Sequence, residues 1–332
     1  MDDIDFVVTY LDGTDPDWLA ERARYASRAD DGSADEARFR NMDNFQYWFR
    51  AVEKFAPWVH RIHLVTWGHV PDWLDVTHPK IHVVEHSEII PPEYLPTFNS
   101  NVIELHFDRI AGITERFVNF NDDVFLAGAT EPKDFFAGDL PVMQIMHTPV
   151  VPSEEFNVAI FYNTLALNEH RTASTRLITP KTFSLRNGVF AVAANVLMVP
   201  ILLYFRKFVG FRPEHVTQPV TRRTYVEVRE TMGTEVQRLL ADRFRTTHSV
   251  SVWLLQDYPR SVGRFQPHNA FRFGRMVPFR DGSDYAKMFS SGYKVVCIND
   301  GPGMSAEAYA AERDKLKQVL ADIFPVKCSF EL

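Results

Sequence analysis

The sequence predicts an α/β fold in which a mostly parallel sheet is covered by helices on both faces. In the first half of the chain, short apolar runs typical of buried strands alternate with segments of helical periodicity. A further strand and helix pattern follows near the C-terminus. The 332 residues are 45% hydrophobic and 13% aromatic, which is enough apolar material for a packed core.

The expected elements follow in chain order. Apolar runs predict strands at 5–10, 61–66, 80–84 and 116–120. Helical spacing predicts helices at 41–55 and 101–112, the second with Ser100 as its cap, and the charged segment 28–36 predicts a loop. A last strand at 294–298 precedes a helix that Ser305 caps and that runs to about Ile323. We expect this closing unit to rejoin the first sheet.

Three parts of the chain are expected. Residues 1–140 form the α/β core, 141–290 form a largely helical insertion or acceptor subdomain with part of the active site, and 291–332 close the core. Inside the insertion, helices are expected at 189–205 and 222–244.

The segment 189–205 is the most apolar run in the chain. It is at the short limit for a membrane span, and Asn195 and Pro200 interrupt it. We expect a buried or interface helix, with a homo-oligomer contact or a peripheral membrane contact as the open alternatives.

Charge and cysteine content exclude several classes of function. A net charge of -7 argues against a nucleic-acid partner, because phosphate-tracking surfaces need clustered basic residues. The two cysteines, Cys297 and Cys328, imply no disulfide framework and favour a reducing compartment. The acidic start lacks the pattern of a signal peptide. We therefore expect a cytoplasmic protein, or one held peripherally at the inner face of a membrane.

Acidic and amide side chains follow three of the expected strands, at 11–18, 121–123 and 299–301. In open parallel sheets, ligands bind beyond the carboxyl ends of the strands. Hard oxygen ligands suit Mg²⁺ or Mn²⁺, which would offset the charge of a bound diphosphate. Asp123 and Asp300 are the expected metal ligands, and which carboxylate binds the ion stays open.

The same segments resemble the conserved regions of the Stealth family, which includes bacterial capsule sugar-phosphate polymerases and the lysosomal-enzyme N-acetylglucosamine-1-phosphotransferase. The first region is matched by IDFVVTYLDGTDPDW at 4–18 and the second by 38–126, with LPTFNSNVIELH and RFVNFNDDVFL. The third is matched by 215–265, and the fourth by CINDG at 297–301 and FPVKCSFE at 324–331. The four regions occur in order and cover more than half of the chain.

The resemblance implies a Rossmann-like, GT-A-like nucleotide-sugar fold and transfer of a sugar 1-phosphate. The implied donor is UDP-N-acetylglucosamine, the implied acceptor is a carbohydrate hydroxyl, and UMP is released. The alternatives are a conventional glycosyltransferase that releases UDP and an inactive carbohydrate-binding relative. The sequence does not fix the sugar, the nucleotide or the acceptor.

The family's catalytic positions fall on Glu104, Asp123, His215 and Arg245. The resemblance makes His215 either a general base or a covalent nucleophile, and it makes Arg245 a clamp for phosphate oxygens. A competing His-x-Pro motif begins at His147.

The residues that contact the nucleotide-sugar donor are expected from their positions relative to the predicted strands and helices. The turn after the first strand faces the nucleotide, and a helix N-terminus with a nearby basic group favours phosphate. The expected substrate-binding residues are Tyr10, Asp12, Gly13, Arg40, Asn41, Asn44 and Asn121.

Overall fold

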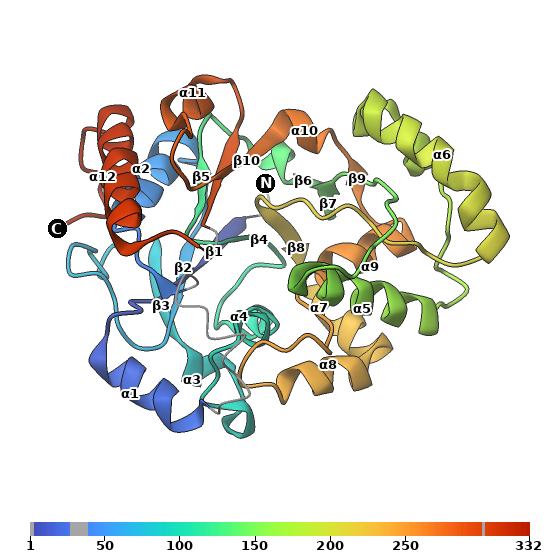
Figure 1. Ribbon diagram of the computed structural model, residues 1–332, viewed down its shortest axis with the longest axis horizontal. Helices are drawn as coiled ribbons and strands as arrows, with labels where there is room; N and C mark the ends of the chain where they lie inside the picture. The colour runs from blue at the N-terminus through green and yellow to red at the C-terminus, as the bar shows by residue number, and fades with distance from the viewer. Residues whose placement is uncertain (1–2, 27–38, 301–302) are drawn as a thin grey trace.

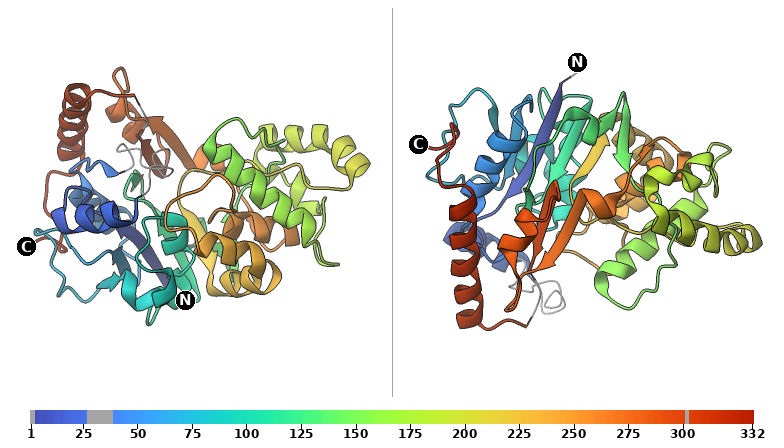
Figure 2. Two further views of the ribbon diagram at one scale, coloured as in Figure 1. Left: turned by 60° about the horizontal axis from the view of Figure 1, so that its bottom comes forward. Right: turned by 90° about the horizontal axis from the view of Figure 1, so that it is seen from above.

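The computed structural model describes residues 3–26, 39–300 and 303–332 (Figure 1). The predicted loop at 28–36 and Gly301 lie outside the described residues. Two sheets, one of five strands and one of three, stand next to each other in the part of the molecule that holds both termini, and the helices of the insertion extend away from them (Figures 1 and 2).

The five-stranded sheet has the order β3-β2-β1-β4-β8. Its strands are β1 (Ile4–Tyr10), β2 (Ile62–Thr66), β3 (Ile81–Glu85), β4 (Arg116–Phe120) and β8 (Gln218–Thr221). The first four are parallel, and only β8 runs antiparallel, beside β4. The order 3-2-1-4 is that of a Rossmann-like sheet. The four strands expected in the first half of the chain are confirmed within one residue at each end.

Helices cover both faces of this sheet, as expected. Successive side chains of a strand point to opposite faces, so Phe6 and Val8 of β1 enter one core cluster and Val7 the other. The first cluster includes side chains of α2 (Phe45–Phe55) and α12 (Ala306–Ile323). The second includes side chains of α7 (Arg222–Thr231) and α9 (Leu254–Val262).

The closing unit does not rejoin the first sheet, so that expectation is wrong. The last strand, β11 (Val295–Asn299), pairs in parallel with β10 (Gly274–Pro278) and antiparallel with β5 (Val124–Leu126). The chain turns at 121–123 and leaves the first sheet there, so β11 pairs with the strand that follows the turn. A third sheet joins β6 (Phe136–Ala137), β7 (Leu140–Met143) and β9 (Gln266–Pro267).

Two expected helices are broken. The segment 101–112 forms only α4 (Ser100–Glu104) and a 3-10 turn at Phe107–Arg109, and Asn99 caps α4 in place of Ser100 by accepting from the N–H of Asn101. The segment 222–244 is divided into α7 and α8 (Gly233–Leu240), because glycine disfavours a helix interior. The remaining helices are α1 (Pro16–Tyr25), α3 (His86–Ile89), α5 (Glu155–Glu169), α6 (Val189–Phe205), α10 (Ala270–Phe273) and α11 (Tyr285–Ser290).

The segment 141–290 supplies β8 to the first sheet and β10 to the second, so it is tied to the core by strand pairing. The division into three parts stays a prediction. The expected helix at 189–205 is α6, but it is not a buried helix, because seven of its apolar side chains are more than half exposed. No described helix is both long and apolar enough to cross a membrane.

A buried carboxylate closes the amino end of the first sheet. Asp5 accepts the backbone N–H of Thr114 at 2.9 Å and contacts His60 at 2.7 Å and His63 at 3.1 Å. The ring of His63 meets that of His82 at 2.8 Å. Burial raises the pKa of Asp5, but the hydrogen bonds outweigh this and hold the pKa below its ordinary value of 3.8.

We expect Asp5→Asn to lower the free energy of unfolding by about 1–3 kcal/mol at pH 7, because a buried network loses its charged acceptor. The depressed pKa means that this stabilisation is complete above about pH 4 and is lost as the pH falls further. Urea unfolding at pH 7 and pH 3 should therefore show a gap between wild type and variant that narrows in acid. Asp314→Asn, at a side chain that is 68% exposed, is the control and should change stability by less than about 0.5 kcal/mol. An equal gap at both pH values would contradict this role.

Candidate active site

Three segments far apart in the sequence bring Asp123, His215 and Cys297 together. Asp123 lies in the turn after β4, His215 in the loop before β8, and Cys297 on β11. One ligand atom from each lies within 4.8 Å of the others. The Cys297 thiol donates to the Asp123 carboxylate at 3.5 Å, and the N–H of Ile298 donates to the Asp123 carbonyl at 2.8 Å. Strand β11 of the second sheet therefore contacts both the side chain and the backbone of Asp123.

Burial and, secondly, the charge of neighbouring Asp122 raise the pKa of Asp123 to about 7. One carboxylate oxygen, Oδ1, is buried and forms no hydrogen bond within the described residues. The adjacent carboxylate at this turn, Asp122, is exposed. Asp123 is therefore the carboxylate that faces the cluster.

Arg245 and Glu104 flank this cluster. The Arg245 guanidinium donates to Ser100 Oγ at 2.5 Å, at the start of the helix that ends with Glu104. Burial raises the pKa of Glu104 to about 7, while Arg245 and Ser100 oppose the rise. Burial and the Arg245 charge both lower the pKa of His215. The charge of Arg245 thus acts on both Glu104 and His215, and His215 in turn lies beside Asp123.

His215 is packed by aromatic rings. Its ring stacks on Trp253 with centroids 5.8 Å apart, and Phe156 meets it edge-on. The competing His147 is 1% exposed and lies between Phe208 and Phe211 in the core. Of the two histidines, only His215 lies beside Asp123.

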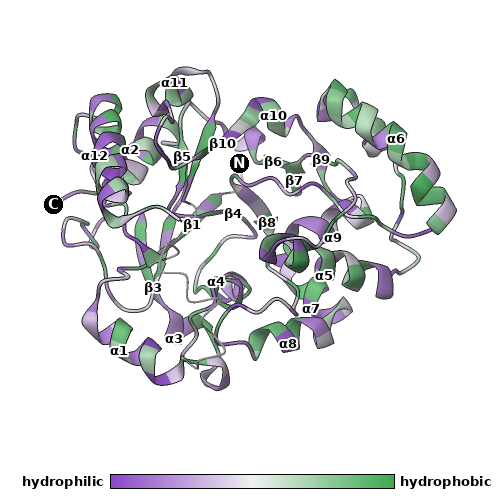
Figure 3. Ribbon diagram, viewed as in Figure 1, coloured by the Kyte–Doolittle hydropathy of each residue, from purple (hydrophilic) through white to green (hydrophobic). Residues whose placement is uncertain are grey.

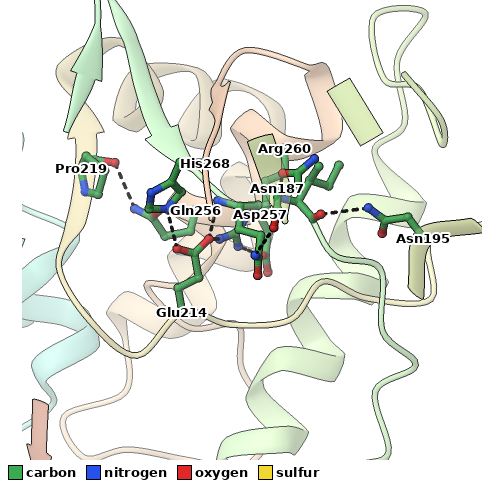
Figure 4. A network of polar contacts seen from close by, with 10 residues as sticks. Asn187, Asn195, Glu214, Pro219, Gln256, Asp257, Arg260 and His268 are labelled. Atoms are coloured by element: carbon green, nitrogen blue, oxygen red, sulfur yellow. Dashed lines mark hydrogen bonds and ion pairs between the residues drawn. The ribbon is translucent and has the colours of Figure 1, made fainter. Parts of the chain in front are cut away.

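The residue before His215 anchors the loop. Glu214 Oε1 accepts from the Arg260 guanidinium at 2.9 Å and from the backbone N–H of Gln144 at 2.6 Å, and Oε2 lies 3.2 Å from His268 (Figure 4). Arg260 also donates to the Gln144 carbonyl and contacts Asp257. The loop that carries His215 is therefore fixed by a buried ion pair to α9.

The predicted donor residues of the first turn lie at the same edge of the sheet. Tyr10 stacks on Phe45, and burial and several carboxylates, Asp12 first among them, raise its pKa to about 12. Asp12 accepts from the N–H and hydroxyl of Thr14. A Cβ on Gly13 would lie 2.0 Å from the carbonyl oxygen of Phe39. The lack of a side chain at Gly13 therefore allows its backbone to lie close to the backbone of Phe39.

The other predicted residues are more dispersed. Arg40 lies over the ring of Tyr309 at 4.9 Å, and burial and then the charge of Asp300 raise the pKa of that tyrosine. Asn41 accepts from the N–H of Asp43, Asn44 precedes α2 without capping it, and Asn121 closes the turn before β5. The potential metal ligands that cluster with Asp123 are His215 and Cys297, and Asp300 is not among them.

The residues partly fit the expected Mg²⁺ or Mn²⁺. The unpaired Oδ1 of Asp123 and nearby carboxylates are hard ligands, and they leave local negative charge to be offset. Cys297 does not fit, because burial raises the pKa of its thiol and the protonated sulfur donates to Asp123. We therefore assign Cys297 to holding Asp123.

Several site residues were not found by sequence reasoning. Trp253, Cys297, Glu214 and Arg260 were given no role in the site, and Ser100 was expected only as a helix cap. Cys297 is the next-to-last residue of the predicted strand 294–298, so its place on the strand was a usable signal. No local signal marks Arg260, because its partner Glu214 lies 46 positions away.

Known proteins match the chain over its whole length. The family described as Stealth protein CR2, conserved region 2, matches residues 38–142. The capsular polysaccharide phosphotransferase WcwK of Streptococcus pneumoniae is 36% identical over 100% of this chain and 99% of its own. The receptor polysaccharide phosphotransferase WefC of Streptococcus oralis is 36% identical over 100% of both. The exopolysaccharide phosphotransferase cps2G of Lactiplantibacillus plantarum is 34% identical over 99% of this chain and 96% of its own.

These full-length relationships define an enzyme of the phosphotransferase class. The chain belongs to the Stealth family, as its motifs predict. Among solved structures, the galactosyltransferase LgtC is similar with a TM-score of 0.44 and 10% identity over 96% of each chain. The strand order itself defines the fold class.

We expect Glu214→Gln to lower kcat for phosphoryl transfer by about tenfold or more with donor KM unchanged, because the loop that positions His215 loses its charged anchor. Breaking a buried pair should also cost about 3 kcal/mol of stability or more. Glu227→Gln is the matched control, since Glu227 pairs with Arg223 and Arg264 at a distance from the loop. Steady-state kinetics on both variants, with folding checked by circular dichroism, should show the kcat loss only in Glu214→Gln. Equal kcat losses in both variants would reduce the role of Glu214 to general stability.

Proposed function

We propose that this enzyme transfers N-acetylglucosamine 1-phosphate from UDP-N-acetylglucosamine to a hydroxyl of a polysaccharide or oligosaccharide and releases UMP. The observation that carries the proposal is the convergence of Glu104, Asp123, His215 and Arg245 from separate segments of the chain. Full-length relatives named as capsular, receptor and exopolysaccharide phosphotransferases support the carbohydrate acceptor.

The proposed reaction breaks a phosphorus–oxygen bond and leaves the sugar–oxygen bond intact. The acceptor oxygen attacks the phosphorus that carries the sugar, the bond from this phosphorus to the bridging oxygen breaks, and UMP departs with the electron pair. His215 receives the acceptor proton. In the alternative with a covalent intermediate, a ring nitrogen of His215 attacks first and the acceptor then displaces it.

Positive charge and positioning come from Arg245. A guanidinium presents a planar fork that matches phosphate oxygens, and it lies here beside His215 and Glu104. Ser100 contacts both Arg245 and Glu104, so the buried Glu104 holds the guanidinium in place through this hydroxyl and through its own charge. Glu104 is not a member of a solvated surface array.

The donor is proposed to lie along the carboxyl edge of the first sheet. Tyr10, Asp12 and Gly13 lie at the nucleotide end, and Arg40, Asn41, Asn44 and Asn121 line the approach of the phosphates. Asp123 and Asp300 are proposed to hold a Mg²⁺ or Mn²⁺ ion. When bound, this ion would offset the negative charge of the diphosphate.

The function is tested by the nucleotide that is released. We expect incubation with UDP-N-acetylglucosamine and an oligosaccharide acceptor to yield UMP, and excess chelator to stop the release until Mg²⁺ or Mn²⁺ is restored. Chromatography of the nucleotides gives the answer. Release of UDP would assign the enzyme to conventional glycosyl transfer, and full activity in chelator would remove the metal from the proposal.

We expect His215→Ala to abolish transfer while donor binding is retained, because His215 acts on the acceptor proton or the phosphoryl group and not on ground-state donor binding. Arg245→Ala should weaken both, because its guanidinium contacts the donor phosphates before and during transfer. Isothermal titration with the donor and a single-turnover assay separate the two effects. A phosphorylated His215 trapped without acceptor would select the covalent route. Normal transfer by His215→Ala would overturn the assignment, and His147→Ala serves as the matched histidine control.

A further inference from the structure

One helix presents an apolar face to solvent. On α6, six of the seven apolar side chains that are more than half exposed form three adjacent pairs spaced seven residues apart, so these six share one side of the helix. They are Val189, Phe190, Val196, Leu197, Leu203 and Tyr204, with exposed fractions from 53% to 82%. The helix lies at the outer edge of the molecule and is apolar along almost its whole length (Figure 3).

The opposite side of α6 is firmly attached. Ala191, Asn195 and Leu202 are fully buried. The Asn195 side-chain amide donates to the carbonyls of Ile145 and Thr182 and accepts the N–H of His147. These bonds fix the rotation of the helix about its axis, so the same apolar face always points outward.

The chain around this face is strongly basic. Residues 170–213 contain seven Lys and Arg residues and no Asp or Glu, in a protein whose net charge is -7. Arg186 precedes the helix, Arg206 and Lys207 follow it, and all three are exposed. Cations therefore stand at both ends of the apolar face.

The length of the helix decides how it meets a lipid layer. Seventeen residues rise roughly 25 Å, which is shorter than the roughly 30 Å of a hydrocarbon core. A helix of this length with basic ends lies in the interface, with its apolar side chains among the acyl chains and its cations at anionic headgroups.

We infer that the exposed face of α6, with Arg186, Arg206 and Lys207, docks the enzyme on an anionic lipid surface. A second copy of the chain fits less well, because symmetric pairing along α6 would bring like charges together at the helix ends. Long apolar side chains and flanking cations complement acyl chains and negative headgroups together. This inference does not depend on the donor or acceptor proposed above.

The test is co-sedimentation of the full chain with vesicles. We expect binding to phosphatidylcholine vesicles with about 30% phosphatidylglycerol, at least about tenfold weaker binding to pure phosphatidylcholine, and weakening by added salt. The triple variant Phe190→Ser/Leu197→Ser/Tyr204→Ser should lose at least about tenfold in vesicle binding. Its nucleotide release with a water-soluble acceptor should match wild type, which separates this test from that of the proposed function.

The matched control is Val76→Ser/Met276→Ser/Val326→Ser, three exposed apolar side chains elsewhere. It should bind vesicles as the wild type does. Equal binding by wild type and the α6 variant would overturn the inference. A dimer seen by light scattering in the absence of lipid, and lost in the α6 variant, would assign this face to a second copy instead.

Discussion

The guanidinium of Arg260 is 1% exposed and lies beneath the loop that carries His215. It meets the Glu214 carboxylate, the Asp257 carboxylate and the Gln144 carbonyl, and so connects the loop, α9 and the end of β7. Removing these charges from water costs free energy, and hydrophobic residues of similar volume often stabilise a protein as much as a buried ion pair does. What the pair supplies is a fixed geometry, since a guanidinium with several partners permits few arrangements.

The geometry around Asp123 depends on the junction between two sheets. The chain leaves the first sheet at the turn 121–123 and enters the second as β5, so Asp123 lies where both sheets end. The first sheet brings Tyr10 and Asp12 to the same edge, and the second brings Cys297. Burial and the charge of Asp122 raise the pKa of Asp123 to about 7, while the hydrogen bond from the Cys297 thiol opposes the rise.

The sequence predicts most of the first sheet, because β1 to β4 are continuous apolar runs whose burial leaves little choice of conformation. It also predicts Asp123 at a strand end and, through the family motifs, His215 and Arg245. It does not predict that β11 pairs with β5, because antiparallel pairing between distant strands has no local signal. Likewise, the start of α4 depends on the Asn99 cap, whose side-chain amide donates to the carbonyls of Asp242 and Phe244, more than a hundred positions away.

The contact between Cys297 and Asp123 spans 174 positions of the chain. A ribosome adds about 5–20 residues each second, so Asp123 emerges roughly ten to thirty seconds before its thiol partner exists. Arg245 and His215 also arrive late. During that interval the first four strands can already assemble, yet the nascent chain lacks the group that holds its central carboxylate. The contact that holds Asp123 therefore forms only after the last strand, β11, has been made.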